Sequence, residues 1–302
     1  MNETVTLIFN GLSLSSIILL TSLGLAITFG LMKVINMAHG EFLMIGGYMT
    51  YVAQNIFLKL FPGQASALYY PFAIVFSFFV TFGLGCLLEK TVITHLYGRE
   101  VDSLLATFGI SLVLQQLART VFGTQGVNVT APKWLQGGLS VGSVTFSYNR
   151  LFIIAIVASC FLVIYFVMYR SGFGKQMNAV MQDRPMAQCM GINSSRIDWV
   201  TFGIGSGLAG VAGCSLALLG SIDANLGQNY IVQCFITVVL GGVGNLLGAV
   251  IGAVIVGFST IFVQHYTSSN IANAVVMLII IIFLQKRPQG LFALRSRALD
   301  EE

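Results

Sequence analysis

The sequence predicts an all-α polytopic membrane protein with about eight or nine transmembrane helices, some interrupted or re-entrant, and a small external hairpin loop. Apolar residues make up 56% of the 302 residues and charged residues only 9%, whereas a soluble domain has about 25% charged residues. The apolar residues form long continuous runs, each close to the length of about 20 residues that crosses a bilayer as a helix. Strands of a membrane barrel would instead alternate over about ten residues, so helices are expected.

The apolar runs mark the predicted spans, which lie near residues 10–31, 39–58, 68–88, 103–122, 150–170, 198–220, 228–244, 247–265 and 270–285. The runs at 228–244 and 247–265 are so close together that one of them is a candidate re-entrant segment. Glycines at four-residue spacing within 203–213 and 244–252 predict close helix packing. We expect one transmembrane domain over residues 1–302, with an external loop at 123–149, a cytoplasmic linker at 171–197 and a cytoplasmic tail at 286–302.

The basic residues predict the orientation. When the linker and the tail are placed in the cytoplasm, all but four of the 15 Lys and Arg residues fall on the inside, as is typical of cytoplasmic loops. The four on the outside are Lys59, Arg119, Lys133 and Arg150. We therefore expect a multi-pass protein of the bacterial inner membrane, with its N-terminus outside and its C-terminus in the cytoplasm.

The external loop reads GTQGVNVTAPKWLQGGLSVGSVTFSYN and is polar, glycine-rich and partly alternating. Its stretch SVGSVTF predicts a short strand, with a turn at Gly137–Gly138. This pattern predicts a small exposed hairpin. Two interpretations stay open: a cap over the helix ends, or a docking surface for a component that arrives from outside.

The sequence offers little support for an enzyme. It has no GxxxxGK[ST], HExxH or EF-hand pattern, and its histidines, His39, His95 and His265, lie in separate segments. The five cysteines form no CxxC pair, so neither a metal site nor a disulfide framework is predicted. No run of Lys or Arg reaches three residues, so nucleic acid is not an expected partner. A transporter, a channel or an assembly subunit remains.

A polar cluster interrupts the apolar pattern at residues 30–49, GLMKVINMAHGEFLMIGGYM. Asn36, His39 and Glu41 surround Gly40, and a charged group costs about 2.5–3.5 kcal/mol at the centre of a bilayer. The orientation places the cluster at the cytoplasmic end of the first two spans, where we expect it to line or brace a gate. Alternatively, His39 donates to a backbone carbonyl freed by a kink at Gly40, and Glu41 caps helix N–H groups.

A second interruption is the sequence GGVGN, with Gly241, Gly242, Gly244 and Asn245. Each glycine weakens a helix by about 1 kcal/mol relative to alanine, and a break is tolerated only where it is buried in protein or lines a watery cavity. Paired interrupted segments in the two halves of a transporter often mark its substrate pathway. Both interruptions therefore belong to the predicted translocation pathway. Gln228 and Gln233 are further polar candidates for its lining.

The linker at 171–197 predicts two short helices with methionine-rich faces. Met177, Val180 and Met181 share one face of the first helix, and Pro185 suits the first turn of the second. The second helix then has an apolar side formed by Met186, Ala187, Met190 and Ile192, and Gly191 suits its end. The linker is interpreted as a docking element for a cytoplasmic partner, because methionine adapts to a partner's groove. The alternative is an amphipathic segment on the bilayer surface.

Five stretches together resemble the permease subunits of branched-chain amino acid ABC importers. They are GLMKVINMAHGEFLMIGGY, AQCMGIN, GSGLAGVAG, VVLGGVGNLLGAVIGA and QKRPQGLFAL. Within that superfamily, DRPMAQCMGI, GSIDANLGQNYIVQCF and FLQKRPQGLFALRSRALD look most like the urea importer permease. The resemblance covers nearly the whole chain.

The resemblance implies partners and a function. The family's permease pairs with a second, related permease, and here a heterodimer or a homodimer is open. Two cytoplasmic ATPases drive the cycle and hold the ATP, an external binding protein delivers the solute, and no cofactor is expected in this chain. The linker matches the ATPase-coupling region, with Arg184, Pro185, Ala187, Gly191 and Ile192 as its candidate residues.

The expected function is that of a permease subunit for a small polar solute, with urea as the first candidate. A branched-chain amino acid is the alternative solute. An ATP-independent urea channel, a secondary transporter and a structural membrane subunit are the competing classes.

Overall fold

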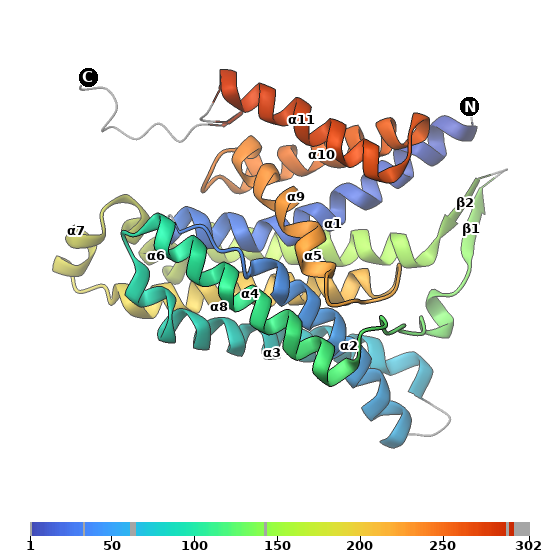
Figure 1. Cartoon of the computed structure of the whole chain (residues 1–302), viewed down its shortest axis with the longest axis horizontal. Helices are drawn as coiled ribbons and strands as arrows, with labels where there is room; N and C mark the ends of the chain where they lie inside the picture. Colours follow the sequence, from blue (N-terminus) through green and yellow to red (C-terminus); the bar gives the residue numbers. More distant parts are fainter. Residues whose placement is uncertain (1, 33, 61–64, 142–143, 288–289, 293–302) are drawn as a thin grey trace.

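The computed structural model describes residues 2–32, 34–60, 65–141, 144–287 and 290–292. Nine of its helices match the nine predicted apolar runs (Figure 1). They are α1 (Asn2–Met32), α2 (His39–Leu60), α3 (Ala65–Thr91), α4 (Glu100–Phe122), α5 (Tyr148–Arg170), α8 (Ser194–Leu216), α9 (Leu226–Gly241), α10 (Leu246–Tyr266) and α11 (Ser269–Lys286). The predicted all-α polytopic fold is confirmed.

Among the described residues, 7 helices are long and apolar enough to cross a membrane: α1, α3, α4, α5, α8, α10 and α11. The helix α9 has only 16 residues, which fits the predicted short or re-entrant segment. The helix α2 has 22 residues but is not among the seven. Most of the predicted tail, including Arg295 and Arg297, lies outside the described residues.

Two features define opposite ends of the bundle (Figure 1). One end carries the hairpin of β1 (Gly138–Val141) and β2 (Val144–Ser147), and we call it the hairpin end. The other end carries α6 (Gly172–Gln182) and α7 (Arg184–Cys189), and we call it the linker end. Two 3-10 turns, η1 (Ile93–Leu96) and η2 (Lys133–Leu135), complete the connections.

The hairpin exists, but its predicted turn is wrong. Gly138 is already the first residue of β1, and the antiparallel register pairs Gly138 with Ser147 and Val141 with Val144. The chain therefore reverses between Val141 and Val144. Gly137 has a φ of 113° and leads into the strand, so its backbone freedom serves the entry to the hairpin and not its tip.

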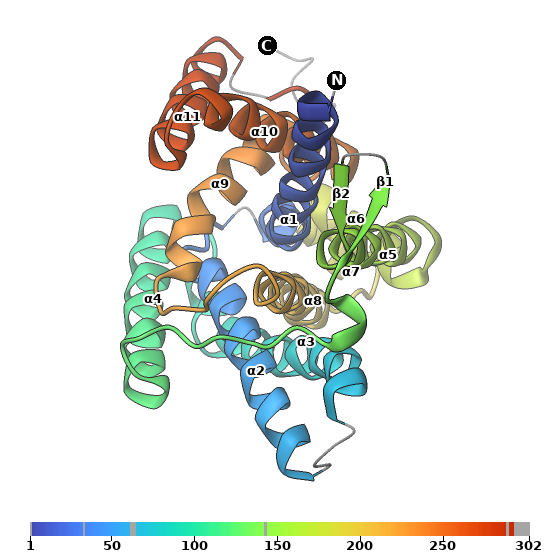
Figure 2. The same cartoon turned by 90° about the vertical axis from the view of Figure 1, so that its right-hand side faces the viewer.

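The helix α8 lies in the middle of the bundle, with α1, α2 and α3 packed around it (Figure 2). Glycines make this close approach feasible, as the sequence predicted. A Cβ added to Gly213 would lie 1.8 Å from the carbonyl oxygen of Leu43 on α2. One added to Gly24 on α1 would lie 2.3 Å from the carbonyl oxygen of Gly205. No other side chain fits at these crossings.

The start of α2 lies deep in the bundle. The Nε2 atom of His39 is 3.2 Å from the carbonyl oxygen of Thr21, halfway along the predicted span at 10–31. A Cβ on Gly40 would lie 2.4 Å from the carbonyl oxygen of Gly227, at the start of α9. The prediction that residues 39–41 lie at the cytoplasmic end of the first two spans is therefore wrong. The chain after α1 turns back into the bundle before α2 begins.

Candidate functional site

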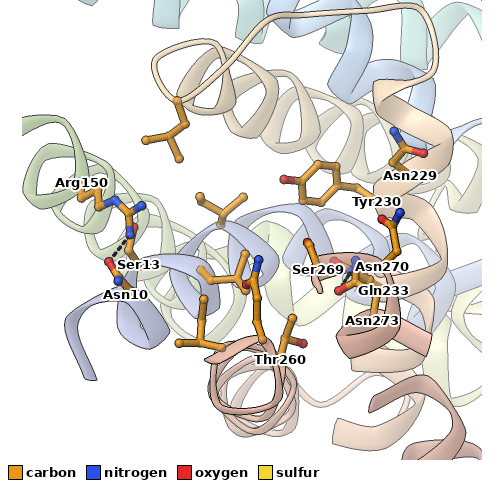
Figure 3. A pocket seen from close by; sticks show the side chains of 15 residues that line it. Asn10, Ser13, Arg150, Asn229, Tyr230, Gln233, Thr260, Ser269, Asn270 and Asn273 are labelled. Atoms are coloured by element: carbon orange, nitrogen blue, oxygen red, sulfur yellow. Dashed lines mark hydrogen bonds between the residues drawn. The ribbon is translucent and has the colours of Figure 1, made fainter. Parts of the chain in front are cut away.

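The hairpin end of the bundle contains a polar cavity of about 480 Å³. It lies between α1, the first turn of α5, α9, the end of α10 and the start of α11 (Figure 3). Its lining residues are Asn10, Ser13, Leu14, Ile17, Arg150, Leu219, Asn229, Tyr230, Gln233, Thr260, Ile261, Gln264, Ser269, Asn270 and Asn273. Of the predicted pathway residues, Gln233 lines this cavity, whereas Gln228 is exposed at the start of α9 and lies outside the lining.

Carboxamides dominate the chemistry of the cavity. Gln233 donates from Nε2 to Oδ1 of Asn273 over 3.2 Å, and Arg150 donates to Asn10 on the opposite side (Figure 3). Each carboxamide offers both donors and an acceptor. Arg150 is the one charged residue among those that line the cavity. The lining therefore suits a small polar solute that needs donors and acceptors together.

The sequence pointed to Gln233 only. The other carboxamides come from α1, α9, α10 and α11, and single Asn or Gln residues in separate apolar segments give no motif that would join them. The signal that existed was polarity near the ends of the predicted spans, at Asn10, Gln264 and Asn270. Only the packing of these ends brings them around one space.

The first interruption holds α2 against two neighbours. Asn36 accepts a hydrogen bond at Oδ1 from the backbone N–H of Ala38 over 3.0 Å. His39 contacts the Thr21 carbonyl of α1, so the prediction of a partner freed by a kink at Gly40 is wrong. Glu41 accepts at Oε1 from Ser111 and Gln115 of α4. The Oε1 atom of Glu41 thus bonds to α4 side chains, and not to the N–H groups of its own helix.

The second interruption is a tight turn between α9 and α10. Gly242 and Gly244 have φ angles of 100° and 81°. Residues other than glycine adopt such positive φ angles only at an energetic cost. Asn245 caps α10 by accepting at Oδ1 from the N–H groups of Leu247 and Gly248. A Cβ on Gly242 would lie 2.3 Å from the carbonyl oxygen of Phe292. Gly241 and Gly242 are therefore buried in protein, whereas Val243, Gly244 and Asn245 are partly exposed.

The two interruptions resemble each other in their local chemistry. Asn36 and Asn245 each accept from the N–H group two residues further on, just before a helix begins. A Cβ on Gly30, near the end of α1, would lie 2.7 Å from the Cα of Gly244. The turn at 241–245 therefore contacts the end of the helix that precedes the first interruption.

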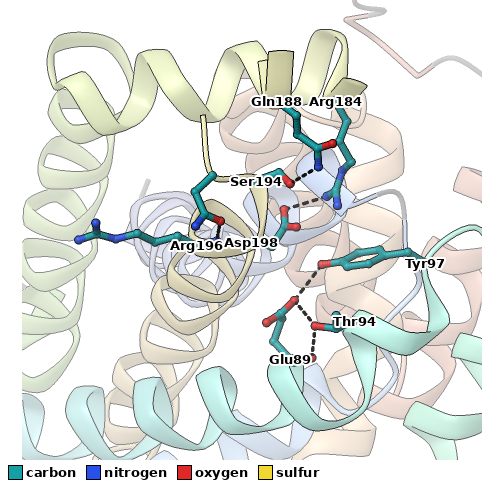
Figure 4. A network of polar contacts seen from close by, with 9 residues as sticks. Glu89, Thr94, Tyr97, Arg184, Gln188, Ser194, Arg196 and Asp198 are labelled. Atoms are coloured by element: carbon teal, nitrogen blue, oxygen red, sulfur yellow. Dashed lines mark hydrogen bonds and ion pairs between the residues drawn. The ribbon is translucent and has the colours of Figure 1, made fainter. Parts of the chain in front are cut away.

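At the linker end, Arg184 connects several elements (Figure 4). Its Nη2 atom is 2.8 Å from Oδ1 of Asp198 on α8, and its guanidinium carbon lies 4.7 Å from the ring centroid of Tyr97. The Tyr97 hydroxyl donates to Oε1 of Glu89 on α3 over 3.0 Å, and Thr94 donates to the same oxygen. Burial, with help from the nearby Asp198 carboxylate, raises the pKa of the Tyr97 hydroxyl, so it stays a donor.

Sequence reasoning named Arg184 but missed Asp198, Tyr97 and Glu89. Each of the three is a single polar residue near a helix end, and nothing in its spacing relates it to the linker. Arg184 was predicted as a candidate residue of the ATPase-coupling region. The structure pairs its guanidinium with Asp198, and about a third of the Arg184 side chain is exposed.

The helix α7 is built as predicted and presents methionines to the surroundings. Asp183 caps it by accepting from the N–H group of Met186, and Pro185 lies in its first turn. Ala187 is buried, whereas Met186 and Met190 are 61% and 77% exposed. On α6, by contrast, Met177 and Val180 are buried. The exposed apolar surface of the linker therefore belongs to α7.

Gly191 ends this element with a φ of 81°. The N–H group of Ile192 then donates to the carbonyl oxygen of Ala187 over 3.1 Å, which closes the turn after the helix. The prediction that Gly191 ends the second linker helix is therefore confirmed.

A multi-pass helical bundle with a polar cavity at one end and an exposed helical element at the other defines a membrane transport subunit. The sequence matches the protein family described as "Branched-chain amino acid transport system / permease component" over residues 7–284. This chain therefore belongs to that family of ABC importer permeases. It is a non-enzymatic transport component, and ATP is handled by separate ATPase subunits in the family.

Three relatives show the extent of the similarity. The high-affinity branched-chain amino acid transport system permease protein BraD of Pseudomonas aeruginosa is 28% identical, with 93% of each chain covered. The protein LivH of Escherichia coli, of the same description, is 29% identical over 94% of this chain and 93% of its own. A probable branched-chain amino acid transport permease protein LivH of Methanocaldococcus jannaschii is 28% identical, over 84% and 79%. No solved structure matches this chain.

These relatives confirm the predicted superfamily. They do not support urea as the first candidate for the solute. The names that they carry refer to branched-chain amino acids, which was the alternative solute in the sequence analysis. They give no support to the nearer resemblance to a urea importer permease.

Proposed function

We propose that this chain forms part of the translocation pathway of an ATP-driven importer, and that the carboxamide cavity is where a small polar solute enters it. The proposal combines the family membership with the position of the cavity, whose lining includes Asn10 of α1 and Arg150 of α5, the two helices that contact β2 of the hairpin. With the excess of basic residues inside, the hairpin end faces outward and the linker end faces the cytoplasm.

The composition of the cavity lining carries the choice of solute, and it favours urea. Urea is uncharged and presents two NH2 donor groups and one carbonyl acceptor, which the carboxamides of Gln233, Asn273 and Asn229 can match. A zwitterionic amino acid also brings an ammonium group. The residues that line the cavity include Arg150 as a partner for a carboxylate, but no Asp or Glu as a partner for the ammonium.

A branched-chain amino acid is the second candidate, and the named relatives favour it. Leu14, Ile17, Leu219 and Ile261 also line the cavity and could contact an aliphatic side chain. At 28–29% identity the relatives share the architecture with this chain, whereas a substrate can change with a few side chains of one cavity.

The helix α7 is the proposed contact for the ATPases. The exposed methionines on it and at its C-cap, Met186 and Met190, give an adaptable apolar surface of the kind that docks into a groove. The fold of this element depends on Pro185 in its first turn, on the buried Ala187, and on the turn at Gly191 that the hydrogen bond from Ile192 to Ala187 closes. The interruptions at 36–41 and 241–245 are the proposed gate, because they lie between the cavity and the linker end.

Co-purification and binding test this function together. The chain is expressed with its neighbouring gene products and purified, and the external binding protein is titrated with urea and with leucine. We expect a second permease, two ATPases, and binding of urea in preference to leucine. Binding of leucine alone would show that the solute is a branched-chain amino acid and not urea. A chain that purifies without any ATPase would contradict the importer assignment.

A further inference from the structure

The helix α4 has two faces of opposite character. Thr107, Ser111, Gln115 and Arg119 recur at every fourth position, so they share one face. The first three are buried. The opposite face is exposed and apolar, and includes Leu105, Leu112, Leu117 and Val121. For a helix in a bilayer this leaves the polar face for contact with the rest of the protein.

The polar face meets the first interruption. Thr107 accepts at Oγ1 from the N–H group of Met37 over 3.1 Å. One turn further, Ser111 donates to Oε1 of Glu41 over 2.7 Å, and Gln115 donates from Nε2 to the same atom over 2.8 Å. We call this contact, formed by Met37, Glu41, Thr107, Ser111 and Gln115, the polar seam.

Apolar packing holds only the hairpin end of α4. Among the described residues, the buried apolar clusters include Leu114, Ala118 and Phe122 of α4, and they include none of its residues before Leu114. The ring of Phe122 stacks on that of Tyr48 with centroids 4.2 Å apart. Arg119 adds a hydrogen bond to Asn225 over 2.8 Å.

The two halves of α4 therefore differ in how they are held. Hydrogen bonds between membrane helices are individually weak and can exchange partners, whereas a stacked and interdigitated contact must be unpacked as a unit. Figure 2 shows α4 at the edge of the bundle, away from the central α8. The linker-end half of α4 is therefore the half whose described contacts with α2 and the segment before it are polar.

Two buried polar atoms at or next to the polar seam lack hydrogen-bond partners. The Oε2 atom of Glu41 and the Nδ2 atom of Asn36 are buried and have no partner within the described structure. An unpaired buried polar atom is costly, and this acceptor and this donor would each gain a partner when a polar solute or water reaches them. Opening of the seam would supply that access.

We propose that α4 is a hinged gate helix: its hairpin end is the fixed end, and its linker-end half parts from Glu41 at the polar seam to let the solute pass. The inference rests on the proposed function, since it names the moving part of the same pathway. It assigns Ser111 and Gln115 as positioning residues, which act through Glu41.

Cross-linking at the two ends of α4 tests the hinge. The inner pair is Met37→Cys with Thr107→Cys, and the matched outer pair is Tyr48→Cys with Phe122→Cys, each closed by a bis-methanethiosulfonate, which forms a reducible disulfide with each thiol. The background is a transporting variant of the full complex in which the five native cysteines are replaced. We expect the inner cross-link to lower ATP-driven uptake by about tenfold or more, with recovery on reduction, and the outer one to leave most of it.

A passive-leak measurement tests the hinge without introduced cysteines. The double variant Ser111→Ala, Gln115→Met weakens the seam, and we expect faster passive leak of solute from ATP-free proteoliposomes. The control is Ser206→Ala. The buried Ser206 hydroxyl donates to the Phe202 carbonyl of its own helix and is not part of the polar seam.

The outcomes separate the two proposals. Uptake that continues at full rate with the inner pair cross-linked, or a double variant that leaks no more than the Ser206→Ala control, would overturn the hinge. Absence of ATP-driven uptake of urea and leucine by the unmodified complex would instead overturn the proposed function.

Discussion

The guanidinium of Arg184 lies 2.8 Å from the carboxylate of Asp198 and so joins α7 to the first turns of α8. The Asp198 side chain is 1% exposed and that of Arg184 is 33% exposed. Because α8 is the central helix of the bundle, a displacement of α7 is passed to the helices that surround it. Tyr97 and Glu89 extend the connection to α3. The docking element is therefore tied to the transmembrane core by side chains.

Replacement of the acid in this connection should uncouple the subunit. In Asp198→Asn, Arg184 loses its charged partner, and we expect uptake to fall about tenfold while the ATPases remain bound and still hydrolyse ATP. Uptake and hydrolysis are measured on the same proteoliposomes. Asp102→Asn is the matched control, since Asp102 forms only an exposed pair with Arg99 at 3.9 Å, which contributes little. Equal effects of the two substitutions would argue against a coupling role.

The glycine crossings should be intolerant of even one methyl group. In Gly213→Ala the added Cβ would overlap the Leu43 carbonyl, so α2 and α8 must separate, and we expect a loss of folded protein after detergent extraction. Fluorescence size-exclusion chromatography measures that loss. In the control Gly109→Ala nothing lies within 4 Å of the new Cβ, and the yield should stay unchanged. A normal yield of Gly213→Ala would mean that this crossing is looser than described.

The end of α7 separates a backbone requirement from a surface requirement. Gly191 has a φ of 81° with open space around the Cβ position, so Gly191→Asn should keep the turn, because asparagine tolerates this region. Gly191→Glu adds strain and a charge beside the exposed methionines. We expect the asparagine variant to retain the ATPases in a pull-down and the glutamate variant to lose them while staying in the membrane. ATPase binding by both variants would contradict a contact at this surface.

The cavity makes its own prediction about affinity. Gln233→Leu and Asn273→Leu each remove a carboxamide that can bind solute, and we expect the KM for uptake to rise by up to about tenfold per hydrogen bond lost. Gln228→Leu is the control, since Gln228 is exposed outside the cavity. Initial rates over a range of solute concentrations give the KM values. A cavity variant that behaves like Gln228→Leu would remove Gln233 or Asn273 from the pathway.

The sequence was sufficient to predict the helices and the linker. Continuous apolar runs, Pro185 and Gly191 act locally, so their consequences can be read without knowing the packing. The depth of His39 and Glu41 could not be predicted, because it depends on α1 and α4 meeting a segment that turns back into the bundle. The turn of the hairpin was misplaced since the pair Gly137–Gly138, at the entry to β1, gave the stronger local signal.

The candidate site was predicted only in part for the same reason. Gln233 was named from its polarity, but its partner Asn273 comes from another helix 40 positions later. Arg184 was named from the linker, whereas Asp198 and Tyr97 become relevant only once three elements converge. Contacts between single polar residues on separate helices carry no local pattern.

ATP-driven uptake into proteoliposomes tests the central claim most directly. The complex purified with its ATPases and binding protein is reconstituted, and accumulation of radiolabelled urea and leucine is followed with ATP and with an ATPase variant that cannot hydrolyse it. We predict accumulation of urea above the external concentration that requires hydrolysis and that falls in Gln233→Leu. Urea entry that only equilibrates, at the same rate with the inactive ATPase, would contradict the account.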